Sequence, residues 1–373
     1  MNALVVGAGN IGAGIALNLI GDGYEVDIAD RSRDSLNKIR DRIPKIRTME
    51  FDALDHASYS ILGNYDITMS ALPGSIGMTF LKNAVKTGNK IVDVSYTPED
   101  PYQLNSIAEN SGSIIIPDMG FAPGLTNAIV GYFVRDLDIV ENVRIYVGGI
   151  PDHQVPPIDY TITWSIEGLI DEYTRPVNIV KDGKKTQVPP LSGIDMLSIG
   201  TYDNLESFYT DGLRSLIRNI ACTGEMFEKT VRYKGHAEKM AAIRDLGYFS
   251  SDRIPGCNLS MFEISERLLL KTLFRPDVHD VALMRVEVDG ERSGRKLKRT
   301  AEMELHYSDE LKRTAMDLAT SLPASITGEY LMNRNVSMSG VIFPEVLSRT
   351  QGYFDQLIKN LIRNKINLRI TES

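Results

Sequence analysis

The sequence predicts an α/β protein in which a doubly wound parallel sheet is joined to an inserted α+β domain with a mostly antiparallel sheet. Two observations support this prediction. Over the first 120 residues, apolar strand-like runs alternate with helical patterns, which is typical of a parallel sheet with right-handed crossovers. After Asn127 the strand-like runs alternate apolar with polar residues and stand further apart, which is typical of antiparallel strands. A chain of 373 residues is long enough for two or three domains.

The first strand leads directly into a glycine-rich turn. Four apolar residues, Ala3 to Val6, precede Gly7-Ala-Gly9-Asn-Ile-Gly12, and an apolar helical pattern follows. Gly7 permits a sharp turn, Gly9 leaves room for a pyrophosphate, and Gly12 allows close helix–strand packing. The free N–H groups at the start of the helix then face the phosphates. The turn predicts a dinucleotide-binding Rossmann domain, and the alternative is an ordinary βαβ unit that binds nothing.

Asp30 supports the prediction of a dinucleotide-binding domain. It ends the second strand, Glu25 to Ala29, and lies 18 positions after Gly12, about where the motif expects the acid that holds the adenosine ribose. Its carboxylate can accept both ribose hydroxyls of NAD and would repel a 2′-phosphate. Arg31 and Ser32 could still hold that phosphate if Asp30 turned away, so NAD is expected and NADP is possible.

The other elements of the first domain continue the same alternation. Strands are expected at 45–51, 65–71, 90–94 and 113–116, and helices around Leu36 and Ile39, at 76–85 and at 101–111. Ligands of a parallel sheet lie beyond the carboxyl ends of its strands. This rule and the glycine turn together select the expected cofactor-binding residues: Gly7, Gly9, Asn10, Ile11, Gly12, Asp30, Arg31, Asp52, Ala53, Ala71, Leu72 and Pro73.

Asp93 and Asp118 follow the fifth and sixth strands and fall nearest to the expected position of the reactive ring. The predicted roles of Asp52 and Asp93 each have a structural alternative. Asp52 could cap a helix instead of approaching adenine, and Asp93 could be a satisfied structural acid.

The second half of the chain predicts a different sheet. Strands are expected at 143–149, 160–164, 205–209, 229–233, 281–288 and 300–306, and helices at 166–173, 212–220, 237–246 and 259–272. Residues 174–192 are expected to form a loop or hairpin. A helix that Pro323 could break is expected at 309–330, and an amphipathic helix at 353–364. We therefore expect a Rossmann domain at 1–125 with 331–373, and a substrate-binding and dimerisation domain at 126–330.

Composition argues against several classes of protein. A net charge of −8 and the lack of a basic run argue against a nucleic-acid partner. Cys222 and Cys257 are too few for a disulfide framework or a structural zinc site and fit a reducing cytoplasm. The sequence shows no signal peptide, no apolar segment that spans a membrane and no metal-binding pattern. A cytoplasmic enzyme with a small-molecule substrate is expected.

Longer motifs in the sequence resemble those of the saccharopine dehydrogenase family, and most closely those of its prokaryotic L-lysine dehydrogenases. Together with the glycine turn they cover nearly the whole chain: Asp118–Asn127, Val147–Pro151, Tyr160–Ser165, Gly168–Tyr173, Thr210–Ser215 and Val231–His236. The resemblance implies a Rossmann domain completed by the C-terminal helix, an inserted α+β domain and a homodimer. It also implies NAD(P)-linked oxidation of an amine-bearing carbon in a lysine-like amino acid.

The resemblance also assigns residues that face the substrate: Ser95, Tyr96, Asp118, Gly120, Thr126, Arg214, Arg232 and His236. Amine oxidation needs a group that takes a proton, and Asp93, Asp118 and His236 are the candidates. A substrate carboxylate suits the two-pronged guanidinium of an arginine, for which Arg214 is favoured and Arg232 is weaker. The plain alternatives are a surface salt bridge for Arg214, a helix N-cap or surface position for His236 and a core position for Trp164.

Three functions remain open at this point. The first is L-lysine dehydrogenase. The second is a saccharopine or carboxynorspermidine type reductase, which needs a second anion site for a second carboxylate. The third is an NAD-binding sensor without turnover.

Overall fold

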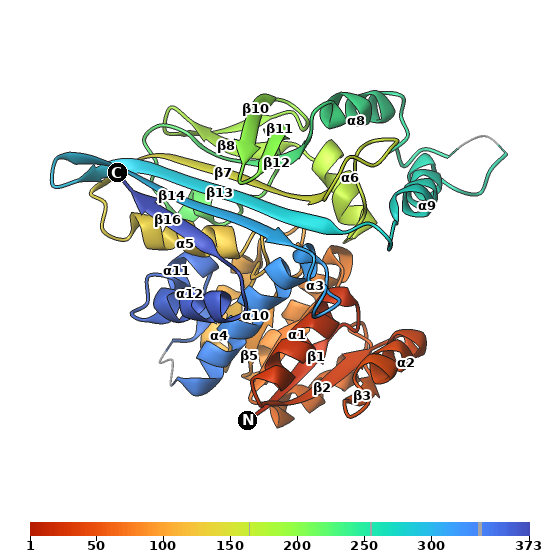
Figure 1. Ribbon diagram of the computed structural model, residues 1–373. Coiled ribbons are helices and arrows are strands. Elements are labelled where there is room, and N and C mark those ends of the chain that lie inside the picture. Colours follow the sequence, from red (N-terminus) through yellow and green to blue (C-terminus); the bar gives the residue numbers. More distant parts are fainter. Residues whose placement is uncertain (164, 254–255, 335–337) are drawn as a thin grey trace. The chain divides into compact units, whose positions relative to one another are not determined.

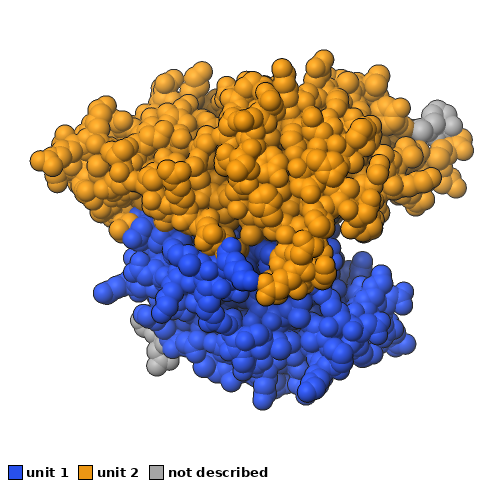
Figure 2. All heavy atoms as spheres, viewed as in Figure 1, with its two compact units in different colours: residues 1–132, 317–365 blue, residues 133–316, 366–373 orange. Residues whose placement is uncertain are grey.

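The computed structural model describes residues 1–163, 165–253, 256–334 and 338–373. The chain forms two compact units, shown in different colours in Figure 2. Unit 1 contains residues 1–132 and 317–365, and unit 2 contains residues 133–316 and 366–373.

Unit 1 is built on a parallel sheet of seven strands in the order β15-β6-β5-β4-β1-β2-β3 (Figure 1). Reversal of the strand order on either side of β1 makes the sheet doubly wound, as the sequence predicted. Its strands are β1 (Asn2–Val6), β2 (Glu25–Asp30), β3 (Arg47–Glu50), β4 (Ile67–Ser70), β5 (Lys90–Asp93), β6 (Ile114–Ile116) and β15 (Gly340–Val341).

The helices of unit 1 alternate with these strands. They are α1 (Asn10–Gly21), α2 (Arg33–Arg42), α3 (Gly74–Ala84), α4 (Asn105–Ser111), α5 (Leu125–Val134), α10 (Ala315–Asn333), α11 (Pro344–Leu347) and α12 (Tyr353–Arg363), with 3₁₀ turns at His56–Asn64, Val85–Thr87 and Pro101–Leu104. Near-continuous apolar strands such as Asn2–Val6 are buried because helices cover both faces of a parallel sheet. Phe51, Tyr59 and Phe80 pack edge-on or tilted in one of the cores.

Unit 2 is built on a mixed, mostly antiparallel sheet. Its strands are β7 (Ile139–Pro151), β8 (Val177–Lys181), β9 (Lys184–Val188), β10 (Asp195–Ile199), β11 (Tyr202–Tyr209), β12 (Met226–Tyr233), β13 (Asp280–Arg292), β14 (Arg295–His306) and β16 (Leu368–Glu372). The main order is β10-β11-β12-β7-β13-β14-β16, and only the β12–β7 pair is parallel among the pairs described. The predicted α+β architecture of the second domain is confirmed.

Four helices accompany this sheet: α6 (Ile166–Thr174), α7 (Leu216–Asn219), α8 (His236–Asp245) and α9 (Met261–Leu273). Helices α6 and α8 contribute Leu169, Tyr173 and Met240 to a buried core that also includes Phe208 of β11. Successive side chains of a strand point to opposite faces. Glu228, Thr230 and Arg232 of β12 therefore lie on one face of the sheet.

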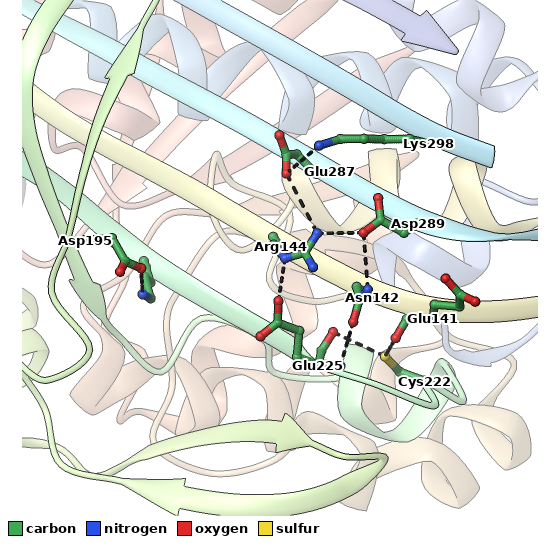
Figure 3. Close-up of polar contacts among 10 residues, drawn as sticks. Glu141, Asn142, Arg144, Asp195, Cys222, Glu225, Glu287, Asp289 and Lys298 are labelled. Atoms are coloured by element: carbon green, nitrogen blue, oxygen red, sulfur yellow. Dashed lines mark hydrogen bonds and ion pairs between the residues drawn. The ribbon is translucent and has the colours of Figure 1, made fainter. Parts of the chain in front are cut away.

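A network of charged side chains lies across the neighbouring strands β7, β12 and β13 (Figure 3). Arg144 of β7 is bonded to Glu225 at 2.5 Å and to Asp289 at 2.7 Å, and Lys298 of β14 is paired with Glu287 at 3.2 Å. Each carboxylate in this network therefore has a cationic partner.

Three local predictions in the second domain were wrong. Residues 160–163 have no strand pairing and pack Tyr160 and Ile162 into the core, and Trp164 lies outside the described residues. The predicted helix at 212–220 is a turn followed by the short α7, because Arg214 adopts a left-handed φ of 51° that a helix does not allow. Strand β10 was not predicted. The polar stretch 174–192 forms the β8–β9 hairpin, one of the two forms expected.

The unit boundaries differ from those expected. Helix α10 belongs to unit 1 from Asp317 onward, where Asn18 of α1 donates to Ser321 and Ser325, each at 3.2 Å. Gly328 of the same helix lies against Met69 of β4. The last residues instead belong to unit 2, because β16 pairs with β14. Within the described residues, no helix is both long and apolar enough to cross a membrane.

Candidate active site

The three glycines of the first turn differ in the space around them. Gly7 has a φ of 108°, and a Cβ there would lie 2.3 Å from the carbonyl oxygen of Ala71. A Cβ on Gly12 would lie 1.8 Å from the carbonyl oxygen of Gly7. A Cβ on Gly9 would meet nothing within 4 Å. Gly7 and Gly12 are thus required by packing, whereas Gly9 leaves open space beside the backbone, as a pyrophosphate needs.

The start of α1 is suited to an anion. Gly9 is its N-cap and supplies no side-chain hydrogen bond to the first turn, and Gly9 and Asn10 are exposed while Ile11 is half-buried. The backbone N–H groups of the first turn therefore have no capping side chain, and they carry the positive end of the helix dipole. This cradle fits the phosphates of a dinucleotide.

Asp30 is fixed beside the same turn. Its two carboxylate oxygens accept hydrogen bonds from the backbone N–H groups of Ala8 and Ser32, each at 2.7 Å. These bonds orient the carboxylate at the end of β2 and leave further lone pairs for ribose hydroxyls. Arg31 is exposed and follows directly.

Asp52 and Ala53 form the turn after β3. The Asp52 carboxylate accepts a hydrogen bond from the backbone N–H of Leu54 at 2.9 Å, and the carbonyl of Ala53 accepts one from the Tyr59 hydroxyl at 2.7 Å. Asp52 is exposed, and its carboxylate closes its own turn. The 3₁₀ turn that follows is capped by Asp55, so Asp52 does not have the helix-capping role considered as an alternative.

The loops after β1, β4, β5 and β6 lie side by side. The Ala71 N–H donates to the Val6 carbonyl at 2.8 Å, and a Cβ on Gly74 would lie 2.1 Å from the Tyr96 carbonyl oxygen. Leu72 and Pro73 connect these points and lead into α3. The Met119 N–H then donates to the Asp93 carbonyl at 2.8 Å. The predicted cofactor and catalytic residues of unit 1 therefore share one edge of its sheet.

Asp93 is the most perturbed acid at this edge. It is 1 % exposed, one carboxylate oxygen accepts a hydrogen bond from the Ser95 hydroxyl at 2.7 Å, and the other has no partner among the described residues. Burial raises the pKa of Asp93 to about 7, the hydrogen bond from Ser95 opposes the rise, and the negative charge of Asp118 adds to it. A carboxyl that titrates near neutral pH suits a group that takes and returns a proton.

The loop from Asp118 to Asn127 is tightly folded. Asp118 is buried with a left-handed φ of 54°, and the Gly120 carbonyl accepts a hydrogen bond from the Leu125 N–H at 2.9 Å. Thr126 is fully buried in α5, and its hydroxyl donates to Asn127 at 3.2 Å. Strained, buried backbone next to an unusual acid is typical of functional sites. Tyr96 is half-buried on the neighbouring loop.

Arg232 is a buried residue of unit 2. It is 2 % exposed, and it donates to Glu172 of α6 at 2.8 Å and to the Val231 carbonyl at 2.9 Å. Its guanidinium also lies 4.7 Å from the ring centre of Tyr160. The charge of Arg232 is thus already neutralised within the domain, which weakens its prediction as the group that binds a substrate carboxylate.

His236 does not have the properties of a catalytic base. It is fully buried at the start of α8, its Nδ1 lies 2.9 Å from the Ile158 carbonyl oxygen, and its Nε2 lies 2.9 Å from the Tyr173 hydroxyl. The carbonyl can only accept, so Nδ1 carries the proton and Nε2 accepts from Tyr173. Burial, together with the positive charge of Arg232, lowers the pKa of His236 to about 3. Both ring nitrogens are occupied, and the geometry fits a satisfied core histidine.

Arg214 lies in the turn before α7 and is half-buried. Its left-handed φ of 51° is uncommon for a long side chain, and such conformations cluster at ligand sites. The prediction that Arg214 contacts the substrate carboxylate stays a prediction.

Two acids near Arg232 were not selected from the sequence. Glu172 pairs with Arg232, and Glu228 lies on the same face of β12 as Arg232. The available signal was a glutamate alternating with Arg232 inside a strand whose every residue is buried. Among the described residues, no group of three or more His, Cys, Asp or Glu side chains could hold a metal ion.

Comparison with known proteins matches two domains of one family to the chain. Residues 3–116 match the saccharopine dehydrogenase NADP binding domain, and residues 120–366 match the saccharopine dehydrogenase C-terminal domain. The apo saccharopine dehydrogenase (L-Glu forming) from Saccharomyces cerevisiae has the same fold, with a TM-score of 0.81, 16 % identity and coverage of 100 % of this chain and 99 % of that one.

The relatives found by sequence are longer proteins, and the match covers only part of each. The chain is 21 % identical over 274 residues to saccharopine dehydrogenase [NADP(+), L-glutamate-forming] of Pyricularia oryzae, covering 68 % of this chain and 59 % of that protein. It is 24 % identical over 227 residues to α-aminoadipic semialdehyde synthase of Arabidopsis thaliana, covering 56 % and 21 %. The matches span less than two thirds of these relatives. The matched domains nevertheless account for nearly all of this chain, which therefore belongs to the saccharopine dehydrogenase family, an oxidoreductase family with an NAD(P)-binding domain.

Proposed function

We propose that this protein catalyses the NAD(P)-dependent oxidation of the amine-bearing carbon of a lysine-like amino acid, with L-lysine as its substrate. The observation that carries the proposal is the buried Asp93 carboxyl, with its pKa of about 7, at the strand ends that carry the dinucleotide cradle. Oxidising an amine requires a proton acceptor at this place, and simple dinucleotide binding does not.

The residues of unit 1 divide the work. The first turn of α1 holds the phosphates, and Asp30 holds the adenosine ribose. When bound, the dinucleotide accepts the hydride from the amine-bearing carbon. Asp93 takes the proton from the substrate ammonium beforehand, since only a neutral amine can lose hydride to form an iminium ion, and it releases this proton to solvent. The same carboxylate, ionised again, then takes a proton from the water that attacks the iminium carbon. It returns this proton to the nitrogen, which leaves as ammonia while the carbonyl forms.

The fixed position of Asp30 favours NAD over NADP. Turning away to admit a 2′-phosphate would break its hydrogen bonds from Ala8 and Ser32. Two lost charge-assisted bonds would weaken binding of NADP by roughly 100-fold if each contributes about 1.5 kcal/mol. Comparing kcat/KM for NAD and NADP tests this preference.

A saccharopine-type reaction is the second candidate, because the relatives named above act on saccharopine or carry semialdehyde synthase names. Saccharopine brings the carboxylates of a second amino acid, which need an additional cationic site. Arg232, one of the two arginines predicted to bind a carboxylate, already pairs with Glu172. This pairing favours lysine, which brings a single carboxylate.

Absorbance of the reduced nicotinamide decides between these functions. Purified protein with NAD or NADP should produce a rise on addition of L-lysine at alkaline pH. A rise in absorbance with saccharopine but not with lysine would favour the saccharopine-type reaction over lysine oxidation. Tight dinucleotide binding with no rise for any amine would instead indicate a sensor without turnover. We also propose a homodimer, as the family resemblance implies, which light scattering would test.

A further inference from the structure

We propose that Ser70 is a positioning residue for the Asp93 carboxyl. Its hydroxyl holds the oxygen Oδ2 in both protonation states, as a donor to the carboxylate and as an acceptor from the neutral acid. The inference rests on the proposed function, because it assumes that Asp93 takes and returns a proton during the reaction. Both residues belong to the parallel sheet of unit 1.

Ser70 and Asp93 are neighbours at the carboxyl edge of this sheet. Ser70 ends β4, Asp93 ends β5, and the two residues are partners in the register of these parallel strands. Partners in adjacent strands lie about 4.8 Å apart, and their side chains point to the same face of the sheet. The Val94 N–H donates to the Ser70 carbonyl at 3.0 Å, so the pairing continues to the end of both strands.

Each of these two side chains has a buried polar atom without a hydrogen bond. Ser70 is fully buried, Asp93 is 1 % exposed, and neither Ser70 Oγ nor Asp93 Oδ2 has a hydrogen-bond partner among the described residues. A buried hydroxyl or carboxylate oxygen in this state costs free energy. Because the two atoms belong to register partners on one face, a rotation of the Ser70 side chain satisfies both.

The two oxygens of Asp93 have different requirements. The Ser95 hydroxyl already donates to Oδ1 at 2.7 Å. The proton of the neutral acid is therefore expected on Oδ2, where it needs an acceptor, whereas the ionised acid needs a donor at the same atom. A hydroxyl can be either, because its hydrogen rotates and its oxygen keeps lone pairs. Ser70 thus fits both states of a carboxyl that exchanges a proton.

The other groups that act on Asp93 come from neighbouring loops. Burial raises the pKa of Asp93, hydrogen bonding by Ser95 and Ser70 opposes the rise, and the negative charge of Asp118 adds to it. Ser95 follows β5 and is bonded to Oδ1, and Asp118 follows β6 and can only repel the ionised form. Ser70 is thus the group on β4 that supports Oδ2.

The experiment compares Ser70→Ala with Thr68→Val as its matched control. Thr68 lies two residues earlier in β4, is also fully buried, and has a hydroxyl without a hydrogen-bond partner among the described residues. Its register partner in β5 is Ile91 and not Asp93. Thr68→Val therefore removes a buried hydroxyl from the same strand and keeps the volume. Ser70→Cys is an intermediate variant, because a thiol is a weak donor.

The pKa of Asp93 is measured by carbon-13 NMR of the side-chain carboxyls in protein labelled at aspartate, from pH 5 to 9.5. Asp93→Asn identifies the signal. This measurement needs neither substrate nor turnover. Beside it, kcat and KM are measured by formation of the reduced nicotinamide with L-lysine over the same pH range.

We expect Ser70→Ala to raise the pKa of Asp93 by roughly half to one pH unit, because a hydrogen bond to the ionised form is about twice as strong as one to the neutral form. Ser70→Cys should raise it less, and Thr68→Val should leave it unchanged. The decline of kcat at acidic pH should move with the pKa. Above pH 9, kcat of Ser70→Ala should remain roughly three- to tenfold lower at an unchanged KM, because the ionised carboxylate is less well oriented.

An Asp93 pKa that is the same in wild-type protein and Ser70→Ala, or that moves as far in Thr68→Val, would overturn the role of Ser70 and leave the proposed function standing. If the pKa moves as expected but wild-type protein oxidises no amine, the hydrogen bond between Ser70 and Asp93 stands and the proposed function fails by itself. Should Ser70→Ala not fold, Ser70→Cys provides the same comparison with Thr68→Val.

Discussion

The Asp93 carboxyl is buried and accepts a hydrogen bond from the Ser95 hydroxyl, and its replacement should affect chemistry more than binding. Asp93→Asn keeps the volume and removes the proton acceptor, so we expect kcat to fall roughly 100-fold or more while the NAD Kd stays the same. In wild-type protein kcat should decline below about pH 7, where Asp93 becomes protonated. Initial rates across pH 5.5–9.5 measure both effects.

Ser95→Ala provides the control for Asp93. The Ser95 hydroxyl donates to the carboxylate and opposes the rise in its pKa, so removing it should move the acidic limb to higher pH. If kcat of Ser95→Ala declines at the same pH as kcat of the wild-type protein, Asp93 is not the group whose protonation lowers the rate.

His236 should matter for stability and not for proton transfer. His236→Phe keeps an aromatic ring but leaves the Tyr173 hydroxyl and the Ile158 carbonyl without partners, at a cost of about 1–3 kcal/mol for each. The lowered pKa of His236 means that the unfolded chain binds a proton below pH 6.5 that the folded chain does not bind. This contribution to stability is complete above pH 6.5 and is lost as the pH falls towards 3. Thermal unfolding of both proteins at pH 5 and 7.5 measures it. An unchanged Tm with lost activity would return His236 to the catalytic candidates.

At the scale of elements, the glycine turn offers a pair of substitutions with opposite consequences. Gly9→Ala places its Cβ in open space, so we expect a normal Tm and an NAD Kd at least about tenfold higher, since the methyl occupies the pyrophosphate position. Gly12→Ala places its Cβ 1.8 Å from a backbone carbonyl and should lower the Tm. Fluorescence titration and thermal unfolding separate the two effects. Equal loss of Tm in both variants would contradict the assignment.

Prediction of the elements succeeded where periodicity and burial agree. The strands and helices of the first 120 residues could be placed because buried runs such as Ala3 to Val6 and Val26 to Ala29 are followed directly by a glycine or an aspartate. Strand β10 was missed because its first residues, Asp195 and Met196, are exposed and have no apolar alternation. The turn at Arg214 was missed because a left-handed conformation of a long side chain is set by tertiary packing.

The candidate site could be predicted only in part, because some of its contacts are also set by tertiary packing. Asp30 and Asp93 follow strands directly, so the topology alone places them. Glu172 lies 60 positions before Arg232, so their ion pair arises only through folding. His236 had a catalytic residue type, but only the contacts with Tyr173 and Ile158 show that both nitrogens are used.

At the scale of the whole molecule, the last strand should matter for unit 2 and not for cofactor binding. Deleting residues 366–373 removes β16, its pairing with β14 and the bond from Arg299 to Glu372. We expect the stability of unit 2 to fall by at least about 3 kcal/mol with an unchanged NAD Kd, because the two backbone bonds between Lys298 and Ser373 and the bond from Arg299 to Glu372 each contribute about 1 kcal/mol. Chemical unfolding and NAD titration measure the two properties.

Glu372→Gln is the milder control, because it keeps the strand pairing and the buried Arg299 keeps Asp136 as its second partner. If the deletion weakened NAD binding as strongly as it lowered stability, the division into two units would not describe how the protein unfolds.

The interleaving of the two units along the chain has a consequence for synthesis. Residues 1–132 emerge from the ribosome first, yet α10, β15 and α12 of the same unit follow only after the whole of 133–316. Until then the edge of β6 has no neighbouring β15, and the partners of Asn18 have not been made. Such sequence-distant contacts slow folding and leave a strand edge open to other chains. We therefore expect nascent chains that stop before residue 316 to be retained by chaperones, and the cofactor cradle to become stable only after residues 317–365 have been made.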